Sequence, residues 1–131
     1  MKVITQFGVA ELDDNPTTID QQAEFVFTMG QCHAFGLAVN QLTGWQLVCD
    51  DDITRGKGHI MIRLPNKLGV FDVAELHEDN GYCPAVTVRQ VECLWEERMR
   101  NWLPPDLGAA MPYAKIRVSQ LKEQFPELVA E

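Results

Sequence analysis

The spacing of apolar positions changes along the chain, and each spacing predicts a different element. The most apolar stretch predicts a helix from about Gln31 to Leu42, with apolar residues on two sides: Phe35, Val39 and Leu42 on one, and Ala34, Leu37 and Ala38 on another. A helix that is apolar on both sides is normally buried between other layers. Gly44 stands where a left-handed C-cap residue belongs, so we expect this helix to end there and to be central in the fold.

Alternation with a period of two predicts a β-hairpin further along the chain. His59 to Leu64 alternates well, Pro65-Asn66 predicts a turn, and Gly69 to Val73 follows as the second strand. An even loop, residues 65–66 or 65–68, would place His59 and Asp72 on the same face, and the shorter one would place them directly opposite each other. An odd loop or a bulge would separate the two side chains.

The remaining pattern predicts shorter elements, and together they indicate an α+β domain. We expect an edge strand at 2–7, a short helix from Ile19 to about Phe27 capped by Thr17 or Thr18, strands at 45–49 and 84–88, and helices at 89–102 and 112–124. In this fold the central N-terminal helix packs on a small antiparallel sheet, and further helices follow at about 89–131. A chain of 131 residues that is 46% hydrophobic is enough for one domain with one core.

Composition and charge exclude several classes of partner. The net charge of -8 disfavours a protein that grips nucleic acid or anionic lipid, because both need clustered Lys and Arg. No segment approaches the roughly 20 apolar residues that cross a bilayer, and the N-terminus lacks the apolar core of a signal peptide. We therefore expect a cytoplasmic protein that binds neither nucleic acid nor membrane, with its oligomeric state left open.

The cysteine and aspartate patterns indicate neither a metal nor a cofactor. The four cysteines form no CxxC pair, and in a reducing compartment we expect free thiols: Cys32, Cys49, Cys83 and Cys93. The acidic run Asp50 to Asp52 lacks the alternating oxygen ligands of a calcium loop, because Ile53, Thr54 and Arg55 follow it. We interpret it as a solvated loop and expect no metal and no cofactor.

One constellation of residues has the composition of a nucleophilic site. Cys32 lies at the predicted helix start, where free backbone N–H groups and the positive end of the helix dipole favour a thiolate. His59 would be the general base, and Asp72 would accept a hydrogen bond from the other ring nitrogen. The backbone N–H of Cys32, helped by a side-chain amide such as Gln31, would stabilise an oxyanion.

Each of these residues also has a structural interpretation. Cysteine is among the residues most often buried, so Cys32 alone would more often be a core residue. His59 would be a polar strand end beside a loop, and His77 would replace it as the base if the hairpin register differed. His33 points about 100° away from Cys32 on a helix, so we interpret it as a local hydrogen-bonding or surface residue. The other cysteines are interpreted as structural.

The order of these residues resembles the papain-like superfamily, particularly its compact NlpC/P60-like branch of bacterial type. The similarity covers about residues 30–73, through Cys32-His-Ala-Phe-Gly-Leu-Ala38, Thr43-Gly-Trp45, His59-Ile-Met-Ile-Arg-Leu-Pro-Asn66 and Val70-Phe-Asp72. It departs at Pro65-Asn-Lys-Leu-Gly69, where such domains have a tighter turn. The resemblance implies a papain-like fold with Cys32 as nucleophile, His59 as base and Asp72 as the residue that orients the base.

Two classes of function follow from this resemblance. The first is a cysteine hydrolase or acyltransferase that acts on an amide, peptide or isopeptide bond of a protein or peptide substrate, through a thioester at Cys32. The second is a catalytically inactive binding protein, such as a small acidic inhibitor or anti-defence protein, that uses the loop at Asp50 to Asp52. A protein-modifying toxin or effector would share the chemistry of the first class.

Overall fold

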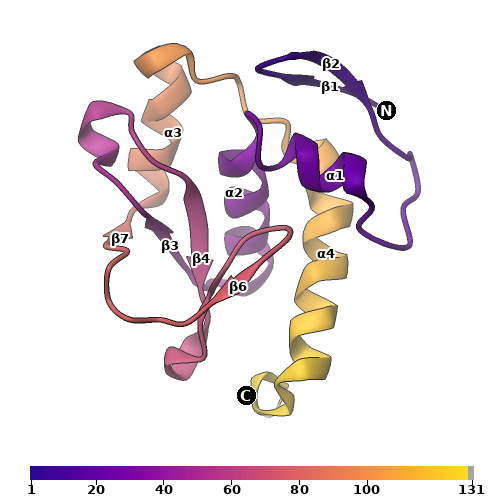
Figure 1. Ribbon diagram of the computed structural model, residues 1–131, viewed down its shortest axis with the longest axis vertical. Coiled ribbons are helices and arrows are strands. Elements are labelled where there is room, and N and C mark those ends of the chain that lie inside the picture. The colour runs from indigo at the N-terminus through magenta and orange to yellow at the C-terminus, as the bar shows by residue number, and fades with distance from the viewer. Residues whose placement is uncertain (130–131) are drawn as a thin grey trace.

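Helix α2 (Cys32–Thr43) lies at the centre of an α+β fold in the computed structural model, which describes residues 1–129. Figure 1 shows α2 between the main sheet and helix α4 (Leu107–Gln124). Both apolar sides of α2 are therefore covered, as its composition predicts, and residues 32–39 are all buried. Gly44 ends the helix in the left-handed conformation, with φ of 73°.

The main sheet is antiparallel and has five strands in the order β6-β5-β4-β3-β7. Its strands are β3 (Gln46–Cys49), β4 (Ile60–Arg63), β5 (Val70–Phe71), β6 (Leu76–His77) and β7 (Ala85–Val86). Gly36 lets α2 approach this sheet closely, because a Cβ there would lie 2.9 Å from Ile60 Cγ2 and 3.2 Å from Leu47 Cδ2. The beginning of α2 and the beginning of β4 are thereby held close together.

The β4–β5 hairpin has the four-residue loop, the longer of the two even loops that the sequence allows. Ile62 pairs with Phe71 and Arg63 with Val70, and the Leu64 N–H donates to Gly69 O, which leaves residues 65–68 as the loop. His59 and Asp72 flank the paired residues on the same face, as an even loop predicts, in a diagonal rather than a directly opposite position. The turn contains Asn66 with φ of 59°, a conformation that asparagine tolerates well.

Several predicted boundaries were wrong, and each has a local reason. Helix α1 (Gln21–Val26) is capped by Asp20, whose side chain accepts from Ala23 N–H, and not by Thr17 or Thr18. Helix α3 (Val88–Glu96) is shorter than predicted because Arg98 has φ of 52°, and the short 3₁₀ turn η3 (Met99–Asn101) follows. Helix α4 begins before Pro112, with Asp106 as its N-cap.

The N-terminal part of the chain forms a separate hairpin, of which the sequence pattern predicts only the first strand. Strand β1 (Lys2–Thr5) pairs with β2 (Gly8–Glu11), which was not predicted, in an antiparallel ladder. Figure 1 shows this hairpin beside α1, near the N-terminal end of α2. Within residues 1–129, no helix combines the length and the apolar character needed to cross a membrane.

Candidate active site

Cys32 is the first residue of α2, and Gln31 is the N-cap residue. Among the described residues, no side chain caps this helix end. The first backbone N–H groups of a helix have no partner within the helix, so they direct positive potential towards the Cys32 side chain. The prediction that the Cys32 thiol lies at the start of a helix is confirmed.

His59 and Asp72 form the closest side-chain pair at the site. His59 Nε2 lies 2.8 Å from Asp72 Oδ2, with the two side chains 26% and 10% exposed. His59 directly precedes β4 and Asp72 directly follows β5, so the hairpin brings them together. This pairing leaves Nδ1 as the His59 ring nitrogen available to Cys32.

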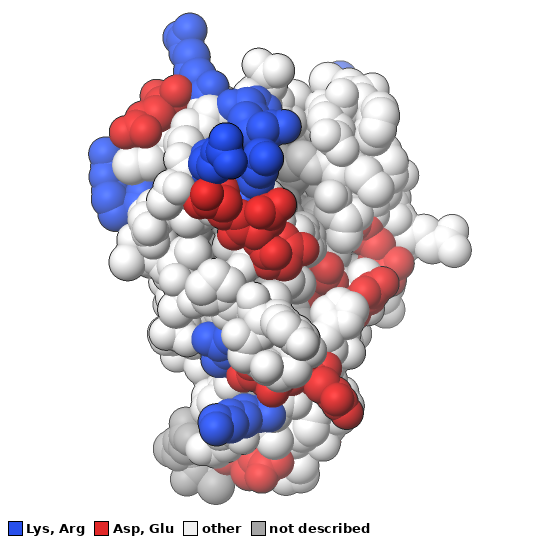
Figure 2. All heavy atoms as spheres, turned by 60° about the vertical axis from the view of Figure 1, so that its left-hand side comes forward, with Lys and Arg blue, Asp and Glu red and all other residues white. Residues whose placement is uncertain are grey.

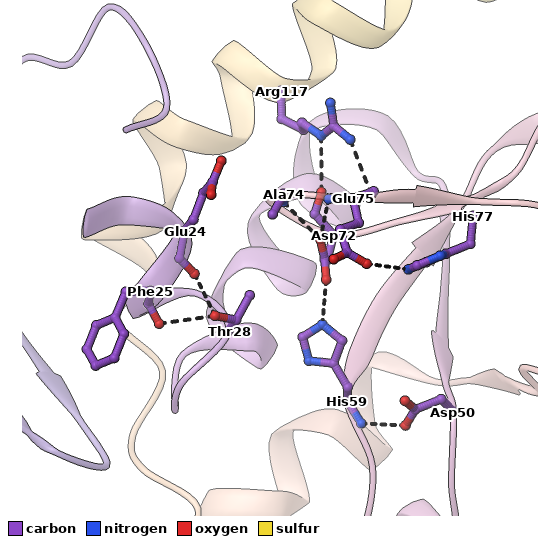
Figure 3. A network of polar contacts seen from close by, with 10 residues as sticks. All are labelled: Glu24, Phe25, Thr28, Asp50, His59, Asp72, Ala74, Glu75, His77 and Arg117. Carbon is purple, nitrogen blue, oxygen red and sulfur yellow. Dashed lines mark hydrogen bonds and ion pairs between the residues drawn. The ribbon is translucent and has the colours of Figure 1, made fainter. Parts of the chain in front are cut away.

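The Asp72 carboxylate is held in place by its own turn. Its second oxygen, Oδ1, accepts from the backbone N–H groups of Ala74 at 2.8 Å and Glu75 at 2.7 Å. Arg117 of α4 donates to Asp72 O and Glu75 O, which fixes the turn from the other side, as Figure 3 shows. Burial raises the pKa of Asp72, but the His59 side chain and the two backbone N–H groups lower it by more, so the carboxylate stays ionised and aimed at the His59 ring.

The backbone on the other side of His59 is also fixed. Asp50 Oδ1 accepts from the His59 N–H at 2.7 Å. Gly58, with φ of 109°, passes so close to Cys49 that a Cβ would lie 2.5 Å from its sulfur. No larger residue would fit at this position, so the approach of His59 to the site depends on glycine.

Cys32 and His59 line one cavity of about 250 Å³. The rest of its wall comes from three segments: Gln6, Thr28 and Gly30 before α2, Gly58 before β4, and Arg100, Asn101, Trp102 and Leu103 after α3. Cys32 itself is only 6% exposed, so the cavity is its access to solvent. The wall includes no carboxylate from the described residues.

The electrostatics of the site favour a thiolate and an imidazolium. Burial raises the pKa of the Cys32 thiol, but the side chains of His33 and His59 outweigh it and bring the pKa down to about 6. Burial lowers the pKa of His59, but Asp72 and Cys32 raise it to about 10. At neutral pH the pair is therefore Cys32 thiolate and His59 imidazolium.

His33 was interpreted as a local hydrogen-bonding or surface residue, but it is buried and its hydrogen-bond partner is 70 residues away in the sequence. It is fully buried, its Nε2 lies 2.6 Å from Leu103 O, and its ring packs edge-on against Trp102 at 5.0 Å between centroids. A ring nitrogen that bonds to a carbonyl oxygen carries a proton, so His33 donates to Leu103 O through Nε2. Its partners come from the segment after α3, which the helical pattern cannot reveal.

The Gln31 side chain does not have the free amide that the oxyanion role requires. It is 1% exposed, its Nε2 donates to Ile4 O and Pro104 O, and its Oε1 accepts from Asp106 N–H. Gln31 instead ties the N-terminal hairpin and α4 to the start of α2. Gln6 lines the cavity with an exposed side chain whose only side-chain hydrogen bond among residues 1–129 is a 3.5 Å contact to Met29 Sδ.

The other residues considered from the sequence lie outside this cavity. His77 is exposed and pairs with Glu75 at 3.0 Å, and all four cysteines are free. Asp52 caps the 3₁₀ turn η1 (Ile53–Arg55), accepting from Thr54 N–H. In the part of the chain that the structure describes, no group of three or more His, Cys, Asp or Glu side chains is placed to hold a metal ion.

No family model matches this chain, and no match was found among curated proteins or solved structures. The chemical capacity of the site therefore follows from its own geometry. Nucleophilic acyl transfer requires a thiol of low pKa, a histidine near it and a carboxylate that orients the histidine. Cys32, His59 and Asp72 are groups of these three kinds.

Proposed function

We propose that the protein is a cysteine hydrolase or acyltransferase that acts on an amide, peptide or isopeptide bond through a thioester at Cys32. The observation that carries the proposal is the His59–Asp72 pair at 2.8 Å, with His59 lining the same cavity as Cys32. The resemblance to papain-like domains supports the same three roles. The acidic charge of the chain disfavours a nucleic acid substrate.

The reaction has two halves, acylation of Cys32 and deacylation, and both Cys32 and His59 act in each half. The Cys32 thiolate attacks the carbonyl carbon, and the carbonyl π electrons move to oxygen to form an oxyanion. As the oxyanion collapses, the C–N bond breaks and the amine leaves with the proton of His59, which gives a thioester and neutral imidazole. Water or an acceptor amine then gives its proton to His59 and displaces Cys32, which leaves as thiolate.

The oxyanion needs donors that are free to turn towards the cavity. The backbone N–H of Cys32 is one, because it lies in the uncapped first turn of α2. We assign the second to the side-chain amide of Gln6, which takes the place expected for Gln31. Asp72 is a positioning residue, since it acts through His59.

The test is direct detection of the thioester. Wild-type protein is mixed with p-nitrophenyl acetate, quenched in acid and analysed by intact-mass and peptide mass spectrometry. We expect one acetyl group on Cys32, formed within the burst of p-nitrophenol and lost on longer incubation. Cys32→Ala should abolish both the adduct and the burst, whereas Cys49→Ala, which removes a buried thiol outside the cavity, should leave both unchanged.

Two results would contradict the proposal. Acetylation spread over lysines and all cysteines, without a burst, would show that Cys32 has no special reactivity. A burst that survives Cys32→Ala would place the nucleophile elsewhere. The first result would favour the alternative of a binding protein without catalysis.

A further inference from the structure

The N-terminal hairpin carries an apolar surface that no described part of the chain covers. Ile4 on β1 and Val9 on β2 lie directly opposite each other and are 55% and 68% exposed. Phe7, in the turn between the strands, is 72% exposed, and the centroid of its ring lies 6.0 Å from that of Phe25 on α1. Single exposed apolar side chains are normal on a protein surface, but a group of them marks an interaction site.

Strand β2 also has an outer edge whose main-chain groups have no partner among residues 1–129. The Leu12 N–H donates to Met1 O at 2.7 Å and the Met1 amino group donates to Leu12 O at 2.7 Å, so these residues form a hydrogen-bonded pair. In an antiparallel ladder such pairs alternate with pairs that are not hydrogen-bonded, and Val9 and Glu11 belong to the second kind. Their N–H and C=O groups therefore point away from β1.

An open strand edge is a template for pairing with another extended segment. The opposite edge of the hairpin is already occupied, because Ile4 O accepts from Gln31 Nε2 and the Gln6 N–H donates to Met29 O. A further strand can therefore join this hairpin along β2. Its side chains would lie beside the exposed side chains of β2, so those side chains indicate the chemistry of the strand that fits.

The exposed face of β2 changes from apolar to acidic along its length. Val9 is followed two residues later by Glu11, which ends the strand, and then by Asp13 and Asp14, all of them exposed. The cations at this end of the hairpin are Lys2, opposite Glu11, and the amino group that pairs with Glu11 and Asp14. Three carboxylates against two cations leave this end acidic, which favours a partner with Lys or Arg here.

The rest of the molecule argues against a second copy of the chain as this partner. Lys2 is the only Lys or Arg in residues 1–54, so the group of Lys and Arg side chains at the upper end of Figure 2 comes mainly from later segments. In an antiparallel pairing of two β2 strands, the acidic end of each would lie beside the apolar end of the other. Neither end would meet its complement, and two chains with a net charge of -8 repel each other.

We propose that β2 binds an extended segment of another protein, which joins the hairpin as a third, antiparallel strand. Antiparallel pairing continues the ladder of the hairpin and is more stable per residue than parallel pairing. The segment carries Lys or Arg beside Asp13 and Glu11, and apolar residues beside Val9 and Phe7. Because side chains two residues apart share a face, its sequence alternates: two cationic and then two apolar residues, each separated from the next by one residue.

This surface brings a bound polypeptide to the edge of the cavity that Cys32 lines. Strand β2 begins after the turn formed by Gln6 and Phe7, and Gln6 lines that cavity. An antiparallel segment on β2 therefore has its C-terminal end at this turn. The inference goes beyond the proposed acyl transfer and does not rest on it, because binding to β2 is measured without turnover.

The test is the binding of a synthetic peptide to the full chain, followed by NMR. The probe is Ac-Lys-Thr-Lys-Thr-Val-Thr-Val-Thr-NH₂, and the matched control peptide has Glu in place of both Lys. Backbone amide shifts of ¹⁵N-labelled protein are recorded as each peptide is added at low and at high salt. We expect saturating shifts at the amides of Val9 and Glu11, with the Lys peptide bound about tenfold more tightly than the Glu peptide at low salt. This preference should shrink as salt is raised.

A charge reversal separates the role of this surface from that of the net charge. Glu11→Lys should weaken binding of the Lys peptide and strengthen binding of the Glu peptide, each by about threefold. Glu123→Lys makes the same change of charge at an exposed position of α4 and should alter both affinities little. A gain in affinity for the Glu peptide cannot arise from a loosened hairpin. Val9→Pro removes an outward N–H that the ladder does not use, so it should abolish the shifts with both peptides.

Four results would overturn the inference. Absence of shifts at Val9 and Glu11 with the Lys peptide would show that β2 accepts no strand. Equal affinity for the two peptides, or equal effects of Glu11→Lys and Glu123→Lys, would show that the charges of β2 do not select the partner. Hairpin shifts that grow with protein concentration in the absence of peptide would identify a second copy of the chain as the occupant.

Discussion

Cys32 and Cys49 are both buried thiols in one chain, and their surroundings move their pKa in opposite directions. They are 6% and 0% exposed, so burial by itself penalises the thiolate at both positions. At Cys49 burial raises the pKa, helped by the charge of Asp50, and the thiol donates to Lys57 O at 3.3 Å. At Cys32 two histidines outweigh the same penalty. The difference shows that the neighbours of a buried thiol, and not its burial, decide whether it can be a nucleophile.

The largest expected effect is the difference in alkylation rate between these two cysteines. With iodoacetamide at pH 7 we expect Cys32 to react about a thousandfold faster than Cys49, because Cys32 is mostly thiolate and lines a cavity. The Cys32 rate should rise as pH increases through about 6, where its pKa lies, and level off above it. Peptide mass spectrometry over a pH series measures both. Similar alkylation rates at Cys32 and Cys49 would contradict the conclusion that their neighbours shift the two thiol pKa values in opposite directions.

Substitution of His59 should make Cys32 behave more like Cys49. In His59→Ala burial still raises the Cys32 pKa while one of its two opposing side chains is lost, so we expect about a hundredfold slower alkylation at pH 7. The midpoint of the pH profile should move above 6. His77→Ala, which removes an exposed histidine outside the cavity, is the control and should react as wild type does. A Cys32 rate that is unchanged in His59→Ala would show that His33 and the helix end suffice.

The smallest of these effects is expected from Asp72→Asn. Against the effect of burial, Asp72 raises the His59 pKa, so its neutral replacement should bring that pKa down from about 10 and let the imidazolium lose its proton at lower pH. We expect about tenfold slower alkylation of Cys32 at pH 7 to 8, because the thiolate then has a weaker cationic partner. NMR titration of the His59 ring provides the second readout. Asp79→Asn, which breaks a pair with Arg63 away from the site, should leave the His59 titration unchanged.

Much of the local structure could be predicted because it depends on short-range periodicity. The apolar stripes around Phe35 predict a buried helix, and the alternation from His59 onward predicts that an even loop places His59 and Asp72 on one face. The loop length itself could not be predicted, since residues 65–68 form a turn with Asn66 in the left-handed conformation. The end of α3 was missed for the same reason, because a left-handed Arg98 has no signal in the pattern.

The sequence by itself determined the buried helix with its thiol at the start and the two strands that bring His59 and Asp72, but not β2, β6 or the even loop that places these two side chains on one face. Only the tertiary structure decided which side chains surround them: His33 bonded to Leu103, Gln31 committed to Pro104 and Asp106, and Arg100 in the cavity of Cys32. The physical reason is range. Periodicity records which face of its own element a residue occupies, whereas a pKa and a binding cavity depend on charges and dipoles a few ångströms away, which the fold brings from distant parts of the chain.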